Sequence, residues 1–290
     1  MRSLSRLARI IVLLTLVAGL SACSAFRLGY NTLGDVAYWW LDSYLDFTPQ
    51  QATRVREDLA RLHRWHRSEE LPRLEQMLQR MEQLVPQDVS HEQACSFMTE
   101  FRERLLTVAR QAEPAAVPLA SGLQPDQLQH LQHKYEKNNA DYTSEWVRLD
   151  AAEQKEKRYR QFLDRAEKIY GRLDEPQRQE LRRDVERSIF DPKRILAERE
   201  RRQQDALQTL GRIVRERVTF EQARLMLRGY VERALTPPGA AARAYQDALV
   251  DEGCRHVAIL HNSTTLAQRE AAVRRLRAWQ RDLRELANGR

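Results

Sequence analysis

The chain has 290 residues, with 48 Lys and Arg against 41 Asp and Glu, a formal net charge of +7. Only ten glycines and ten prolines interrupt a sequence rich in Arg, Gln, Glu, Leu and Ala, which favours helices and leaves no phosphate-binding loop. Acidic and basic side chains alternate closely, as in residues 199–201, and this is typical of solvated helix faces rather than of a nucleic-acid-binding surface.

Residues 1–22 have the features of a secretory signal peptide. Three arginines precede an apolar stretch at 10–20, which is too short to span a bilayer. The following Leu-Ser-Ala-Cys at 20–23 resembles the lipobox of bacterial lipoproteins, which implies cleavage before Cys23 and acylation of that cysteine. The alternative is an ordinary signal peptide followed by a chance cysteine.

An acylated Cys23 would hold the exported chain on a membrane, because two buried acyl chains already give stable anchoring. Ser24 follows it in place of Asp, which under the enteric sorting rule implies transfer to the outer membrane. Without residues 1–22 the chain keeps 45 basic against 41 acidic side chains, a formal charge of +4. We therefore expect a lipid-anchored, periplasm-facing protein of the outer membrane with no nucleic-acid partner.

Residues 23–47 form an aromatic segment next to the predicted anchor. Its part from 30 to 47 holds six of the 21 aromatic residues: Tyr30, Tyr38, Trp39, Trp40, Tyr44 and Phe47. One helical face of this segment carries Val36, Trp40, Tyr44 and Phe47. The segment is either an aromatic belt set among lipid headgroups or the first core helix, and its three aspartates favour the core helix because an anionic surface would repel them.

Residues 48–290 are expected to form an all-α domain, a multi-helix bundle of about eight to ten helices. Apolar residues recur at spacings of three and four, and strand-like alternation is absent. Helix starts with capping chemistry are predicted at Thr48–Gln51, Ser90–Gln93 and Thr219–Gln222. Prolines and glycines predict loops at 113–125 and 236–239.

Two histidine pairs on these helices are candidate metal ligands. His63 and His66, with Glu70 about one turn further, would share a helix face, and His130 and His133 would share another. Zinc and copper accept such ligands. The alternative is surface or partly buried histidine, and because neither pair has a third ligand in a recognised motif, we expect no bound cofactor.

Cys95 and Cys254 are the two cysteines that remain once Cys23 is acylated. In an oxidising compartment such a pair predicts a disulfide, with two buried free thiols as the alternative. A bridge leaves no free thiol in the native protein, and Cys254→Ser should then lower the melting temperature by several degrees.

An internal duplication is one interpretation of the domain, with repeats at 48–170 and 174–290. Val-Ser-His-Glu-Gln-Ala at 89–94 matches Val-Thr-Phe-Glu-Gln-Ala at 218–223, and four further matches continue at the same offset. Convergent helix-start chemistry is the other interpretation. If the duplication is real, the predicted disulfide joins the two halves.

Residues 269–290 hold seven arginines against three acidic residues. This excess suits a solvated helix, or contact with anionic headgroups or cell-wall phosphates. No G-x-S-x-G elbow or other catalytic constellation is present in the sequence, so we expect no enzyme. The expected role is a binding or scaffolding module for a periplasmic protein or a cell-wall component.

Four segments resemble a family of proteobacterial lipoproteins of unknown function. They are 38–51 (Tyr-Trp-Trp-Leu-Asp-Ser-Tyr-Leu-Asp-Phe-Thr-Pro-Gln-Gln), 65–74 with its Trp-His-Arg and Glu-Leu-Pro-Arg-Leu, 138–146 (Asn-Asn-Ala-Asp-Tyr-Thr-Ser-Glu-Trp) and Gln268-Arg269. The resemblance covers nearly the whole exported chain. It implies an all-helical envelope lipoprotein without an assigned activity.

The helix starts at 48–51, 219–222 and 265–268 are also similar to the Leu-Thr-x-x-Gln signature of small periplasmic stress chaperones and metal sensors. The leucine position is occupied by Phe47, Val218 or Thr264, so the pattern is degenerate. This likeness implies an envelope-stress chaperone or a metal-responsive protein as the alternative function, while helix capping explains the same residues without kinship.

Overall fold

The computed structural model describes residues 28–289, so the predicted signal peptide and Cys23 lie outside the described residues. Within this range every regular element is helical, which confirms the all-α prediction. Eleven α-helices are described, one more than the upper number expected. They are α2 (Leu33–Leu45), α3 (Pro49–Trp65), α4 (Leu71–Leu84), α5 (His91–Ser121), α6 (Pro125–Tyr142), α7 (Ala151–Tyr170), α8 (Glu175–Arg187), α9 (Pro192–Glu216), α10 (Phe220–Leu235), α11 (Ala240–Asn262) and α12 (Leu266–Ala287).

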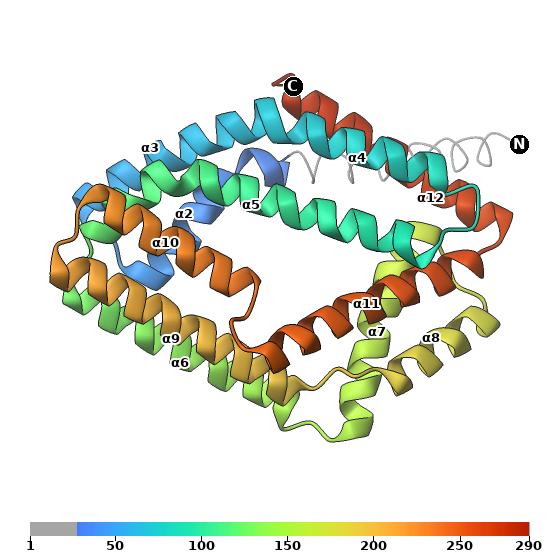
Figure 1. The fold of residues 1–290 in the computed structure, drawn as a ribbon. Coiled ribbons are helices and arrows are strands. Elements are labelled where there is room, and N and C mark those ends of the chain that lie inside the picture. The colour runs from blue at the N-terminus through green and yellow to red at the C-terminus, as the bar shows by residue number, and fades with distance from the viewer. Residues whose placement is uncertain (1–27, 290) are drawn as a thin grey trace, which may run out of the picture.

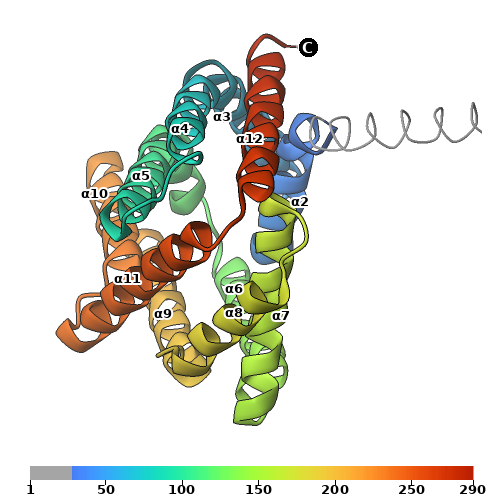
Figure 2. The same cartoon turned by 90° about the vertical axis from the view of Figure 1, so that its right-hand side faces the viewer.

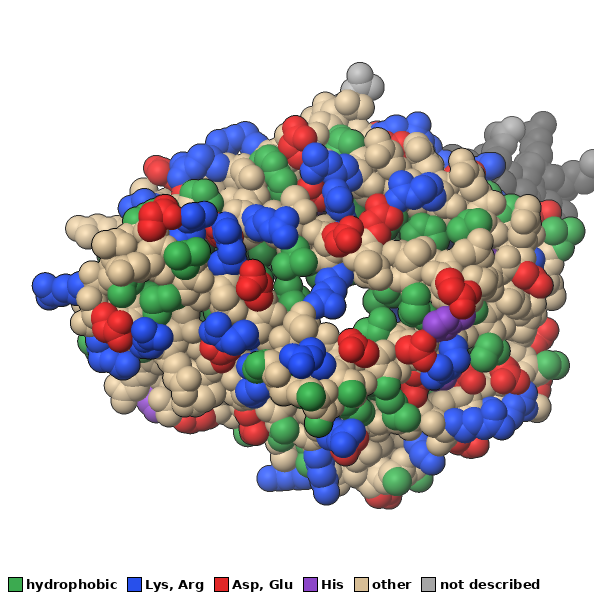
Figure 3. All heavy atoms as spheres, viewed as in Figure 1, with side chains coloured by type: hydrophobic (Ala, Val, Ile, Leu, Met, Phe, Trp, Pro, Cys, Tyr) green, Lys and Arg blue, Asp and Glu red, His purple; other side chains and the backbone are tan. Residues whose placement is uncertain are grey.

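The helices form a frame around a central opening. Along one edge α3 is followed by α4, which runs beside α12, and along the opposite edge α6 runs beside α9 (Figure 1). The same two edges lie at opposite ends of the molecule in Figure 2. In the space-filling view the surface is hollowed between α5, α10 and α11, and acidic and basic side chains are mixed around the rim (Figure 3).

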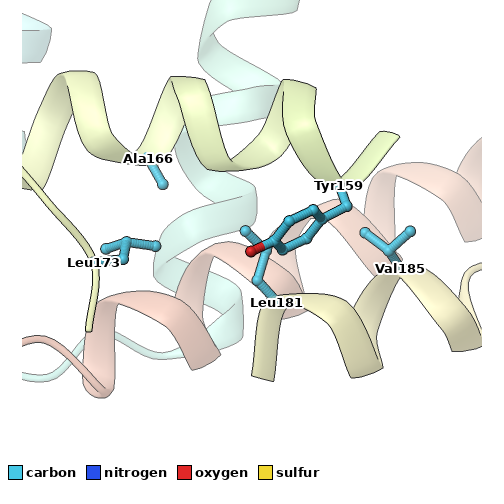
Figure 4. Close-up of a cluster of buried hydrophobic side chains, with 5 residues drawn as sticks. All are labelled: Tyr159, Ala166, Leu173, Leu181 and Val185. Carbon is cyan, nitrogen blue, oxygen red and sulfur yellow. The ribbon is translucent and has the colours of Figure 1, made fainter. Parts of the chain in front are cut away.

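The apolar core is divided into three clusters rather than gathered in one centre, as expected for a frame. One joins α7 and α8 with the turn between them, and its side chains Tyr159, Ala166, Leu173, Leu181 and Val185 face one another in Figure 4. A second joins the end of α5 with α9 and α10. The third joins the start of α4 with the end of α12.

The loop predicted at 113–125 is wrong for most of its length, because α5 continues through Pro114 and Pro118 to Ser121. Each proline removes one backbone donor from the helix. Tertiary packing offsets this cost, since Val117 and Ala120 are buried against α9 and α10. The predicted turn at 236–239 does separate α10 from α11.

Capping boxes begin several helices, as the sequence predicts. At Thr48, Ser90 and Thr219 the side chain accepts from the backbone N–H three residues on, and the glutamine at that position accepts from the cap N–H. Because all groups of a capping box lie within four residues, the motif can be predicted from the sequence without tertiary information.

Two pairs of these capping glutamines also bind each other, which the sequence does not reveal. The Gln177 amide donates to Ser263 O (2.9 Å) and to Gln268 Oε1 (2.7 Å), while Gln268 Nε2 donates to Arg172 O (3.0 Å). Gln51 and Gln127 are hydrogen-bonded to each other in the same way. Gln51 Nε2 also donates to Gly122 O, and Gln127 Nε2 also donates to Asp46 O. Each pair therefore joins the starts of two helices that are distant in sequence, α8 with α12 and α3 with α6.

Replacing Gln177 with alanine should destabilise the protein more than losing an ordinary cap does. Gln177 is 2% exposed, so its loss removes the cap and also leaves buried polar groups of its partners unpaired. We expect Gln177→Ala to lower the free energy of unfolding by about 2–3 kcal/mol. For Gln222→Ala we expect a loss of about 1 kcal/mol or less, because the exposed Gln222 side chain only caps its own helix. Urea unfolding of both variants measures the difference, and equal losses would contradict a role for the glutamine pair.

The stretches 48–170 and 174–290 do not form separate units. Helices of the first lie against helices of the second, with α4 on α12, α6 on α9, and α5 on both α10 and α11. The duplication itself stays a prediction.

None of the described helices combines the length and the apolar character needed to cross a bilayer.

Candidate functional sites

The first predicted metal cluster does not assemble as a ligand set. Nδ1 of His66 is hydrogen-bonded to the Tyr30 hydroxyl at 2.9 Å, and the Tyr30 ring packs against His63 with centroids 4.7 Å apart. Glu70 is 1% exposed and its carboxylate faces Arg73 (2.7 Å) and Arg104 (3.8 Å). Since the carboxylate is neutralised by arginines, the three side chains do not converge on a cation.

A π-helical turn at His66–Glu70 explains why Glu70 faces inward. The N–H of Leu71 bonds to His66 O, five residues back, and Pro72 then lacks the N–H that would bond Ser68 O. The wider turn shifts the helix face by one residue. Pro72 was the signal in the sequence, but helical periodicity alone does not predict a π-turn.

The tyrosine–histidine hydrogen bond of His66 recurs at His261, which is buried. There Nδ1 accepts from the Tyr170 hydroxyl (2.9 Å) and Nε2 donates to Gln87 O (2.8 Å), which is the neutral tautomer. Burial raises the pKa of Tyr170 to about 12, so the hydroxyl keeps its proton and donates. Burial, aided by Arg269, lowers the pKa of His261, although Gln87 O and Asp88 oppose the shift.

The neutral His261 makes stability depend on pH. The unfolded chain binds a proton near the ordinary pKa of about 6.5, whereas the folded chain binds it only at lower pH. The free energy of unfolding should therefore be fully retained above about pH 6.5 and decline as the pH falls below it.

Melting curves between about pH 7.5 and 5.5 should show this decline, and His261→Gln should make it shallower, while burial of His63 and His66, which also lowers their pKa values, maintains the rest. His133→Gln, at an exposed site, should leave the slope as in the parent protein. The prediction would be contradicted by equal slopes in the parent and in His261→Gln.

The second predicted pair, His130 and His133, lies on the exposed side of α6. His130 Nε2 lies 3.2 Å from Ser43 O and is hydrogen-bonded to it. No group of three metal-ligating side chains among the described residues includes either histidine. His130 therefore connects α6 to α2, and the two histidines form no ligand set with a third side chain among the described residues.

The expectation that α2 buries Val36 and Trp40 is wrong. Tyr38 is the residue that is buried, with the Arg56 guanidinium 3.5 Å from its ring centroid. Trp39 and Trp40 are 62% and 58% exposed. We call Leu33, Val36, Trp39 and Trp40, all exposed, the aromatic face of α2. Helical periodicity groups these side chains, but only the position of α3 and α6 decides which group is covered.

Two apolar grooves adjoin the inner side of α2 and share Leu41. One, of about 490 Å³, lies between α3 and α5 and is lined by Leu41, Val55, Leu59, Leu62, Ala116 and Leu119. The other, of about 300 Å³, lies among α6, α9 and α10 and is lined by Leu41, Tyr44, Leu131, Tyr135, Leu210 and Tyr230. Neither lining contains a catalytic pairing of nucleophile and base.

The structure joins Cys95 of α5 to Cys254 of α11 by a disulfide, with the Cα atoms 5.2 Å apart. Two acid–base side chains that the sequence reading missed lie beside it: His91 Nε2 is 2.7 Å from Asp251 Oδ1 and 3.8 Å from Cys95 Sγ. The helical spacing of His91 to Cys95, and of Asp251 to Cys254, was the signal available in the sequence.

The excess of arginine on α12 is largely matched by acids of neighbouring elements. Arg277 pairs with Glu82 at 2.6 Å, Arg284 with Glu75 at 2.9 Å, and Arg269 with Asp88 at 2.5 Å. The hydrogen bond from Arg277 is the largest of the effects that lower the pKa of Glu82. These pairs favour a packed helix over a surface that binds anionic lipid or cell-wall phosphate.

A family model described as "Family of unknown function (DUF6279)" matches residues 43–232. The match includes α3 to α9, both predicted histidine pairs, the end of α2 and most of α10. No curated protein matches the chain, and no solved structure matches it.

Proposed function

We propose that this chain, which belongs to the DUF6279 family of unknown function, is a lipoprotein of the outer membrane. In this proposal Cys23 carries the lipid and the helical domain is a non-enzymatic binding module that faces the periplasm. The signal-like residues 1–22 and the lipobox support the anchor. The observation that carries the proposal in the described residues is the exposed aromatic face of α2.

This face lies within reach of a lipid on Cys23. Leu28 is five positions after Cys23 in the sequence, a separation that extended chain can span over at most about 18 Å. Leu28 is itself exposed and leads directly to the aromatic face. Tryptophan side chains are favoured at the boundary between headgroups and acyl chains, so a membrane surface is a suitable partner for them.

The three aspartates near the aromatic face oppose its contact with a membrane surface less than the sequence suggests. Asp35 lies 3.8 Å from Arg56, and Asp42 Oδ1 accepts a hydrogen bond from Phe47 N at 3.0 Å. An ion pair and a structural hydrogen bond account for two of the three carboxylates. The ion pair with Arg56 reduces the repulsion between Asp35 and an anionic surface.

Metabolic labelling with an alkyne fatty acid tests the anchor. Cys23→Ala should abolish the label and release the protein from the membrane fraction, whereas Cys95→Ala should keep both. Density-gradient fractionation then assigns the inner or the outer membrane. Labelling of Cys23→Ala at the level of the parent protein would refute the anchor.

Fluorescence quenching tests the aromatic face directly. In proteoliposomes with bromine-labelled lipid acyl chains, emission of the parent protein should be quenched, and Trp39→Phe with Trp40→Phe should remove most of the quenching. Trp146→Phe, which changes a side chain packed against Phe190 after the end of α6, serves as the control and should retain it. Quenching that is unchanged in the double variant would place the aromatic face away from the lipid.

The groove between α3 and α5 supports a chaperone-like activity as a second candidate. Its apolar floor and its charged Arg54, Asp58 and Arg61 suit the exposed side chains of an unfolded client. The protein should slow client aggregation at substoichiometric ratios, and Ala116→Glu in the groove should weaken this effect. Ala152→Glu, on the exposed start of α7, is the matched control. Absence of protection across several clients would exclude this candidate.

A further inference from the structure

Four metal-ligating side chains meet where α5 lies against α11. His91 and Cys95 lie one turn apart on α5, and Asp251 and Cys254 lie one turn apart on α11. The ligand atoms of His91, Cys95 and Cys254 all lie within 4.8 Å of one another. Asp251 Oδ1 adds a fourth donor, 2.7 Å from His91 Nε2.

One of the spacings between these donor atoms already matches a tetrahedral zinc site. With Zn–S bonds of about 2.3 Å and Zn–N bonds of about 2.0 Å, neighbouring donor atoms stand roughly 3.3 to 3.8 Å apart. Cys95 Sγ and His91 Nε2 are already 3.8 Å apart. The donors come from α5 and α11, two helices that pack against each other.

Burial and charge at this place also suit a metal ion. Cys254 is buried, whereas Cys95, His91 and Asp251 are half-buried, which leaves a route from solvent. Asp251 uses Oδ2 to bind Arg255 and directs Oδ1 toward His91. Glu92 lies 3.6 Å from His91 Nδ1, on the opposite side of the imidazole ring, and can orient it.

We propose that reduction of the Cys95–Cys254 disulfide converts this place into a zinc site formed by both cysteines, His91 and Asp251. A dithiol reductant passes two electrons and two protons to the disulfide and becomes a disulfide itself. The two thiols formed then lose their protons as Zn²⁺ binds. The disulfide and the zinc ion are alternative links between the same two helices, selected by the redox state.

Zinc titration of the full-length protein in detergent, with a chromophoric chelator as competitor, tests the proposal. After anaerobic reduction the protein should bind one zinc ion per chain, at least about 100-fold more tightly than the oxidised protein does. Cobalt in place of zinc should give the thiolate charge-transfer absorption and the intense visible bands of a tetrahedral site.

The variant His91→Ala should weaken zinc binding to the reduced protein by about 10- to 100-fold, and Asp251→Asn should weaken it less. His133→Ala, on the exposed side of α6, is the matched control and should bind as the parent does. Circular dichroism at each addition follows folding. If reduction unfolds the chain, zinc should restore helicity in the parent and not in His91→Ala.

Two outcomes would overturn the proposal. One is a reduced protein that binds no zinc above the level of the oxidised form. The other is His91→Ala binding as tightly as the parent, since the cysteines alone would then account for the metal.

Discussion

Replacing Cys254 with serine should lower the stability of the protein by about 5 kcal/mol. The disulfide to Cys95 closes a loop across a sequence separation of 159 residues, and the chain-entropy relation gives this magnitude for the constraint on the unfolded state. At roughly 2–4 °C per kcal/mol for a chain of this size, the melting temperature should fall by about 10 °C or more.

Calorimetry of the parent, Cys95→Ser and Cys254→Ser measures this loss, with a metal chelator present so that no ion replaces the link. Both variants should lose a similar amount, because either one opens the same loop. A denatured, non-reduced parent should take up no maleimide on these two residues. Uptake of two equivalents would show that the bridge is absent and that both cysteines are ordinary core residues.

Replacing Glu252 with alanine should lower the free energy of unfolding by about 3–5 kcal/mol, since it leaves the largely buried Arg158 without its carboxylate partner. Glu252 is buried on α11. One of its carboxylate oxygens accepts a hydrogen bond from Ile189 N (2.8 Å). The other accepts from the Ser188 hydroxyl and lies 3.8 Å from the Arg158 guanidinium. Arg158 is held between this carboxylate and the ring of Phe190. The carboxylate thus fastens the connection between α8 and α9 to α11.

Urea unfolding compares Glu252→Ala with two controls. Glu252→Gln keeps an acceptor for Ile189 N and should cost less than the alanine variant. Asp164→Ala breaks an exposed pair with Lys168 on α7 and should change stability by at most about 1 kcal/mol. A loss from Glu252→Ala no larger than that from Asp164→Ala would mean that Arg158 finds another partner or reaches water.

The metal ligands predicted from the sequence show what residue spacing within one helix can and cannot predict. Spacing of three or four residues does place His63, His66 and Glu70 near one another, but the ion pairs of Glu70 with Arg73 and Arg104 use the carboxylate for another purpose. Arg104 belongs to α5, more than thirty residues away, so no local pattern could reveal it. The cluster at His91 could not be predicted from local spacing either, because two of its four side chains, Asp251 and Cys254, come from α11.

The sequence by itself determined the helical class, most helix starts and the two cysteines available for a bridge. Capping boxes and apolar periodicity act within about four residues, so a single chain segment contains all the interacting groups. Only the tertiary structure decided that α2 buries Tyr38 and exposes Trp39 and Trp40, that α5 continues through two prolines, and that Gln177 binds Gln268. Each of these depends on which helix lies opposite, and that choice is made by packing between segments far apart in the chain.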